Sequence, residues 1–137
     1  MQESIVKGKN LLLATDGKGH SSKAAQYAIE LAKLTSSKLF VLYVVSPRNE
    51  TKQQVTIDDG LSSLNELKGR AEEAGVEMTT LLEGGSPYES VLTTAERIQA
   101  GAVIVGTSQK NSLDRVLLGS VSEFVVRNSQ CTVIVVK

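Results

Sequence analysis

Five short runs of mainly apolar residues recur along the chain, separated by longer segments in which apolar residues repeat every three or four positions. Four runs are too short for helices and consist of leucine, alanine, aromatic and β-branched residues, which predicts buried strands. They span 11–14, 39–45, 102–105 and 132–136, and a less regular fifth run spans 76–82. The run at 39–45 is apolar throughout, as in a central strand covered on both faces. The alternation predicts β-α-β-α-β-α-β-α-β and a mostly parallel sheet between two helix layers.

The segments between the runs carry helix signals. Ser21 or Ser22 can cap a first helix, whose inner face is predicted to hold Ala24, Ala28, Leu31 and Ala32, with Tyr27 and Leu34 beside it. A second helix is predicted to end at Gly75, with a face made of Ile57, Leu61, Leu64, Leu67, Ala71 and Ala74. The polar residues 46–56 before it are predicted to form a surface loop.

Ser86 and Pro87 predict the start of a third helix, as N-cap and first helical residue. Its inner face is predicted to hold Tyr88, Val91, Leu92, Ala95 and Ile98, and Gly101 to end it. A fourth helix is predicted to begin at Gly119-Ser120, because Val121, Phe124 and Val125 follow at helical spacing.

Composition excludes several function classes. At 137 residues the chain is predicted to form a single domain, residues 1–137. Fifteen Lys and Arg balance fifteen Asp and Glu, so no basic excess favours nucleic acid or an anionic membrane. The N-terminus lacks a signal-peptide core, and no apolar run exceeds seven residues. The single cysteine, Cys131, cannot form an internal disulfide, which fits a reducing cytosol, and is expected to be a small buried hydrophobe.

Polar turns follow the first and fourth predicted strands, at Asp16-Gly17 and Gly106-Thr107. In a doubly wound sheet of order 3-2-1-4-5, these turns would meet at the carboxyl ends of the strands, where ligands bind. Gly119-Ser120 adds a helix entrance, whose free N–H groups suit a phosphate. The alternative is a serine N-cap without any ligand. Asp16 either starts an Asx-turn or bonds an adenine or ribose edge.

Other site types fit poorly. Residues 17–22 carry serine where the last glycine of a dinucleotide fingerprint belongs, and Ser46-Pro47 replaces the acid expected after the second strand. A G-x4-G-K-[ST] phosphate loop is absent, and Asp16 lacks the acidic neighbours of a phospho-acceptor. His20, the only histidine, has no evident metal-ligating or catalytic partner.

The whole chain resembles the universal stress protein family. The resemblance lies in residues 12–17 with Ser21-Ser22, in 42–45, in 117–123 and in 131–136, together with the spacing G-x2-G-x9-G-[ST] from Gly106 to Ser120. It implies an α/β fold with a doubly wound, five-stranded parallel sheet of order 3-2-1-4-5. It also implies a cytoplasmic homodimer paired through the C-terminal strand and, in one branch of the family, binding of ATP.

The family pattern also implies which residues bind the ligand. The expected ligand is ATP or AMP, and Mg²⁺ could bind together with it. Adenine and ribose would be held by Ala14, Thr15, Asp16 and Val44. The phosphates would be surrounded by Gly106, Thr107, Gln109, Gly119, Ser120, Val121 and Ser122.

Gln109 departs from the family pattern, because the nucleotide-binding branch has a glycine there. A glutamine adds bulk and disfavours positive φ, yet its amide can donate to phosphate. Three hypotheses follow: a nucleotide-binding stress or signalling module, a nucleotide-free dimeric interaction module, and a slow ATPase. The ATPase ranks last, since the sequence places no general base near Ser120.

Overall fold

The structure is a computed structural model, and it describes residues 3–15, 22–45, 50–107 and 120–137. In this part of the chain, five strands form one parallel sheet in the order β3-β2-β1-β4-β5. In chain order they are β1 (Asn10–Thr15), β2 (Leu39–Val45), β3 (Met78–Gly84), β4 (Ala100–Gly106) and β5 (Thr132–Val136). This arrangement confirms the predicted fold class and strand order.

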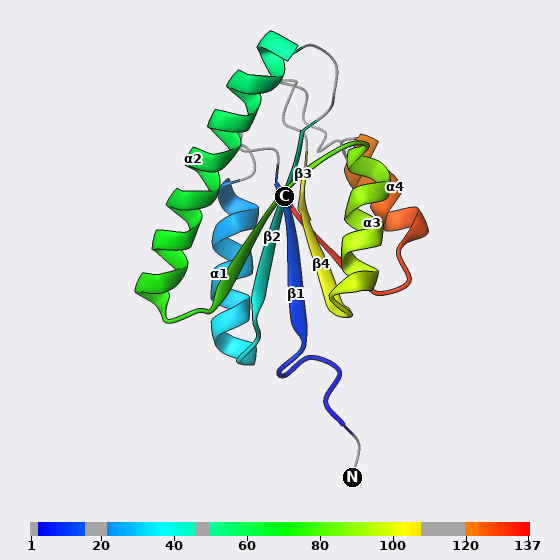
Figure 1. Ribbon diagram of the computed structural model, residues 1–137. Helices are drawn as coiled ribbons and strands as arrows, with labels where there is room; N and C mark the ends of the chain where they lie inside the picture. The colour runs from blue at the N-terminus through cyan, green and yellow to red at the C-terminus, as the bar shows by residue number, and fades with distance from the viewer. Residues whose placement is uncertain (1–2, 16–21, 46–49, 108–119) are drawn as a thin grey trace.

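Within the described ranges, four helices cover the two faces of the sheet (Figure 1). They are α1 (Ser22–Thr35), α2 (Glu50–Ala74), α3 (Pro87–Arg97) and α4 (Ser120–Asn128). Helices α1 and α2 lie on one face, and α3 and α4 lie on the other. The chain thus crosses to the second face after β3, which makes the sheet doubly wound.

Each face has its own hydrophobic core. On the first face, Leu11 and Leu13 of β1 pack with the small residues of α1, which include Ala24 and Ala28. Alanines on the inner helix surface let α1 approach the sheet closely. On the second face, Leu12 lies with Val91 of α3 and Val125 of α4 in a separate cluster. The alternation of Leu11, Leu12 and Leu13 between the cores follows the two-residue period of a strand.

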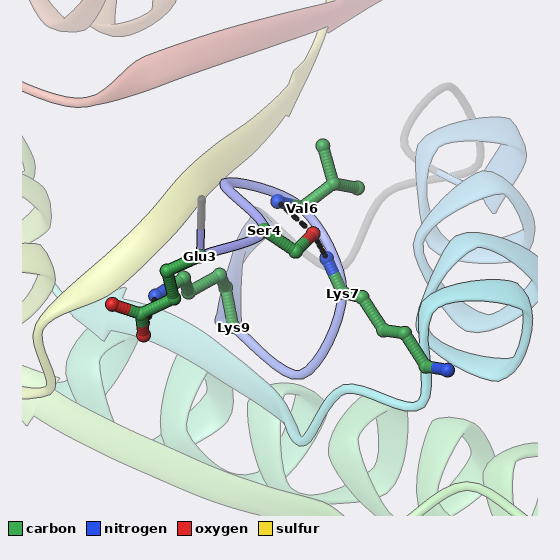
Figure 2. Close-up of polar contacts among 5 residues, drawn as sticks. All are labelled: Glu3, Ser4, Val6, Lys7 and Lys9. Atoms are coloured by element: carbon green, nitrogen blue, oxygen red, sulfur yellow. Dashed lines mark hydrogen bonds and ion pairs between the residues drawn. The ribbon is translucent and has the colours of Figure 1, made fainter. Parts of the chain in front are cut away.

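A short N-terminal segment lies at the amino-terminal edge of the sheet (Figures 1 and 2). The Ser4 hydroxyl accepts hydrogen bonds from the backbone N–H groups of Val6, at 3.2 Å, and Lys7, at 2.8 Å. Lys9 pairs with Glu3 at 3.2 Å. The Gly8 N–H donates to the carbonyl of Thr35 at 2.7 Å, so the segment is fastened to the end of α1. It lies opposite the predicted ligand edge.

The loop predicted over 46–56 is wrong for residues 50–56, because α2 begins at Glu50. Glu50 to Thr56 contains Glu, Lys and two Gln, which are good helix formers despite being polar. Polarity therefore predicts solvent exposure here, not the absence of a helix. The predicted end of α2 at Gly75 is confirmed, with a left-handed φ of 76° at this glycine.

The predicted inner face of α2 is wrong at Leu61, which is 46% exposed. Tyr27 and Leu34, predicted beside the inner face of α1, are 44% and 83% exposed. Ile29 is buried in α1 instead. The helical period locates the buried face of a helix only to within about one residue. Which residues at the margins of that face are buried depends on how the helix packs on the sheet.

The connection from α3 to β4 also differs from the prediction. Helix α3 ends at Arg97, while Gly101 lies inside β4. The reversal is made by Gln99, with φ 53°. A Cβ at position 101 would lie 2.5 Å from the Lys9 Cβ, so Gly101 serves close packing against the N-terminal segment. The third strand runs from Met78 to Gly84, two residues later than predicted.

Candidate functional site

The carboxyl ends of β1 and β4 lie side by side at the point where the strand order reverses. Strand β1 pairs with β2 on one side and β4 on the other, with Thr15 opposite Tyr43 and Leu13 opposite Ile104. The helices that follow β1 and β4 cover opposite faces of the sheet. In doubly wound sheets, such a reversal opens a crevice at the strand ends.

Helix α4 is fastened to the end of β4 by a buried serine. The Ser122 hydroxyl donates to the Gly106 carbonyl at 2.8 Å, and Ser122 is 9% exposed. This bond holds the N-terminal turn of α4 at the carboxyl edge of the sheet. The first N–H groups of a helix have no partner within that helix, and the helix dipole makes this end positive. The turn that contains Ser120, Val121 and Ser122 can therefore receive an anion.

Ser120 differs from Ser122 because it is exposed. Its Oγ accepts a hydrogen bond from the Tyr88 hydroxyl of α3 at 2.9 Å. The Tyr88 ring meets the Phe124 ring edge to face, with 5.4 Å between centroids and 80° between planes. The helical spacing predicts Tyr88 only on the core face of α3. Its place at the start of a helix was the available signal, because helix starts lie at the same edge as strand carboxyl ends in βα units.

Three of the predicted residues supply apolar surface at this edge. Ala14 of β1, Val44 of β2 and Val121 of α4 are half-buried and pack against the core under α3 and α4. They therefore lie on the same face of the sheet as α4. Half-exposed aliphatic groups at strand ends can contact the flat face of a base.

The two predicted threonines have different surroundings. Thr107 is 3% exposed, and its N–H donates to the Val136 carbonyl of β5 at 3.2 Å. This amide is thus engaged in holding β4 to β5. Thr15 is half-buried at the end of β1, opposite Tyr43.

The remaining predicted site residues, Asp16, Gln109 and Gly119, lie outside the described residues, as does His20. Among the residues that the structure does describe, no three His, Cys, Asp or Glu side chains are grouped as metal ligands. Within the same ranges, no helix is both long and apolar enough to cross a bilayer.

A separate cleft of about 340 Å³ lies at the other ends of α3 and α4. It is lined by Leu92, Ala95, Glu96, Gln99, Ala100, Asn128, Ser129, Gln130 and Cys131. None of the predicted site residues belongs to it. Cys131 is half-buried, not fully enclosed as expected, and its Sγ lies 3.3 Å from the Ser129 Oγ.

The strand order and its reversal between β1 and β4 define a doubly wound α/β protein. The sequence model of the universal stress protein family matches residues 8–137. The chain belongs to this family.

Individual relatives agree with this assignment. The universal stress protein MJ0531 of Methanocaldococcus jannaschii is 34% identical over 139 residues, covering 94% of this chain and 82% of that protein. The solved structure of the protein MJ0577 is 28% identical with a TM-score of 0.81, covering 96% of this chain and 97% of that one. A universal stress protein solved in complex with cAMP is 26% identical with a TM-score of 0.74, covering 95% and 97%.

Proposed function

We propose that this protein binds an adenine nucleotide, ATP or AMP, at the carboxyl ends of β1 and β4, and that it acts in the cytoplasm in stress response or signalling. The observation that carries the proposal is the 2.8 Å bond from Ser122 to Gly106. This bond holds the α4 N-terminus at the strand reversal while Ser120 stays exposed. The complex of a 26% identical relative with cAMP supports an adenine nucleotide as the ligand.

Different residues at this edge suit different parts of the nucleotide. The half-exposed side chains of Ala14 and Val44 suit the face of the base, and Asp16, by sequence, suits a ribose or adenine edge. The Ser120 hydroxyl and the backbone N–H groups of the first turn of α4 suit the phosphates. Where Mg²⁺ accompanies ATP, the phosphate oxygens would supply most of its ligands.

A second candidate function follows from Gln109, which replaces the glycine of the family's nucleotide-binding branch. In this alternative, the chain is a nucleotide-free interaction module that keeps the same fold. Nucleotide hydrolysis, the third hypothesis, has less support, because no general base is assigned near Ser120.

We also propose that the protein is a homodimer paired through β5. This strand ends the sheet order, and Val133, Ile134 and Val135 are half-buried on it. The unpaired backbone groups of an apolar edge strand without proline or charge can form hydrogen bonds with another strand. Pairing with a second copy satisfies both edges symmetrically.

Release of bound nucleotide on denaturation tests the proposed function. Protein purified without added nucleotide is denatured, and the supernatant is analysed for adenine nucleotides by chromatography and mass spectrometry. Calorimetric titration of the emptied protein with AMP, ATP and adenosine follows. The proposal predicts tighter binding of AMP and ATP than of adenosine. A dimer that releases no nucleotide and binds none of the three would favour the interaction module.

A further inference from the structure

Tyr88 joins the N-terminal turns of α3 and α4. It is the second residue of α3, after Pro87. Its hydroxyl donates to the Ser120 Oγ at 2.9 Å, and its ring packs edge to face on Phe124. Ser120 and Phe124 are four residues apart and therefore lie on the same face of α4. One side chain thus contacts both the exposed serine of the candidate phosphate site and the helix surface that supports it.

The backbone beneath Tyr88 is well defined. Pro87 fixes φ at the first helical position, and Ser86 is the N-cap, whose carbonyl accepts from the Ser90 N–H at 3.0 Å. The side chain of Tyr88 is half-buried. With its ring held against Phe124, its hydroxyl reaches Ser120 from a fixed direction.

This contact determines how Ser120 can bond a ligand. A serine hydroxyl has one proton to donate and two lone pairs to accept. The Tyr88 proton occupies one lone pair, so the Ser120 proton is directed elsewhere. A hydroxyl that accepts a hydrogen bond is also polarised and becomes a better donor. The Ser120 hydroxyl is therefore oriented to donate a hydrogen bond to a pure acceptor, such as an ionised phosphate oxygen.

We infer that Tyr88 is a positioning residue of the phosphate site, which orients the Ser120 hydroxyl toward a phosphate oxygen and favours nucleotides over unphosphorylated nucleosides. This inference rests on the proposed function. Tyr88 need not touch the ligand itself, because it acts through Ser120.

Calorimetric titration with AMP and adenosine tests the inference on the full-length protein. Tyr88→Phe removes the hydroxyl and keeps the ring on Phe124, so the fold should persist, which a thermal melt checks. AMP affinity should fall about two- to tenfold, the value of one hydrogen bond, while adenosine affinity stays unchanged. Tyr27→Phe is the matched control, since Tyr27 is exposed on α1 at the opposite face.

Three further variants separate positioning from a general structural effect: Ser120→Ala, its combination with Tyr88→Phe, and Ser120→Thr. Ser120→Ala should lower AMP affinity to a similar degree, and the double variant should lose little more than either single one, because both changes remove one linked unit. Ser120→Thr keeps the hydroxyl and should retain most of the AMP affinity.

The outcomes distinguish the inference from the proposed function. If wild type prefers AMP to adenosine and Tyr88→Phe leaves that preference unchanged, the inference is wrong and the proposed function stands. Equal losses for AMP and adenosine, or additive losses in the double variant, would likewise overturn it. If wild type binds neither ligand, the proposed function fails, and the role of Tyr88 fails with it.

Discussion

At the scale of single residues, the two serines of α4 have separate roles although they are two positions apart. Ser122 is buried and its hydroxyl donates a hydrogen bond to the Gly106 carbonyl, whereas Ser120 is exposed and its Oγ accepts a hydrogen bond from the Tyr88 hydroxyl. The sequence pattern assigns both to the phosphates. Their contacts identify Ser122 as the residue that holds the helix and leave Ser120 as the hydroxyl available to a ligand.

Ser122→Ala should therefore destabilise the fold. It leaves the Gly106 carbonyl without the part-buried donor that Ser122 supplies, which costs about 1–3 kcal/mol in the free energy of unfolding. Urea denaturation measures this change. Ser62→Ala, an exposed change on α2, is the control and should stay within about 0.5 kcal/mol. Equal stabilities of the Ser122 variant and wild type would contradict the holding role.

In contrast to Ser122, a substitution at Thr94 is expected to increase the free energy of unfolding. It is 1% exposed on α3, and its Oγ1 has no hydrogen-bond partner among the described residues. Replacing this hydroxyl by a methyl group of the same shape, in Thr94→Val, removes a desolvated polar atom. The free energy of unfolding should rise by about 1 kcal/mol in the same urea assay. Thr93→Val, exposed one residue earlier, should change little, and a clear loss of stability at Thr94 would refute the prediction.

At the scale of elements, helix α2 contains two glycines in contrasting surroundings. A Cβ at Gly60 would lie 2.8 Å from two ring carbons of the buried Tyr43, whereas a Cβ at Gly69 would meet nothing within 4 Å. Helix propensity alone favours alanine over glycine at both positions by about 1 kcal/mol. Packing of the helix against the sheet therefore determines whether each glycine-to-alanine substitution stabilises or destabilises the protein.

Gly69→Ala should stabilise the protein by up to about 1 kcal/mol, because only propensity changes. Gly60→Ala should destabilise it by about 1–3 kcal/mol, because the Tyr43 ring must move within a packed core. Thermal or urea unfolding of the two variants beside wild type measures both. Stabilisation by both substitutions would show that α2 does not pack on Tyr43 as described.

The strands were the most predictable elements, and the boundaries of the helices were the least. Runs such as Leu39–Val45 are short, apolar and rich in β-branched and aromatic residues, which favours a buried strand over a helix. The polar start of α2 carries no periodic signal, and the end of α3 depends on Gln99, a residue without special turn propensity. Within the candidate site, Gly106 and Ser120 were predicted from spacing. The contact between Tyr88 and Ser120 joins residues 32 apart in sequence, which no local pattern encodes.

At the scale of the whole molecule, the edge strand β5 determines how copies could associate. The Val136 carbonyl accepts from Thr107 of β4 at 3.2 Å. Because the N–H and C=O of one residue point to the same side of a parallel strand and alternate along it, the backbone groups of Val133 and Val135 face away from β4. These groups would pair with a second copy.

We expect the protein to have the mass of a dimer at micromolar concentration in analytical ultracentrifugation. Val135→Pro removes an outward N–H without removing a bond to β4, and it should shift the mass toward the monomer while far-UV circular dichroism keeps its shape. Val126→Lys, an exposed change on α4, should leave the mass unchanged. A monomeric wild type would contradict the proposed pairing.

The central claim is that the phosphate of an adenine nucleotide lies at the N-terminus of α4. Nuclear magnetic resonance of ¹⁵N-labelled protein, titrated with AMP and separately with adenosine, tests it most directly. We predict large shifts of the Ser120, Val121 and Ser122 amide signals with AMP and small ones with adenosine, and no change at Ser129 or Cys131 in the far cleft. Unchanged α4 amide signals at saturating AMP, or changes confined to the far cleft, would contradict it.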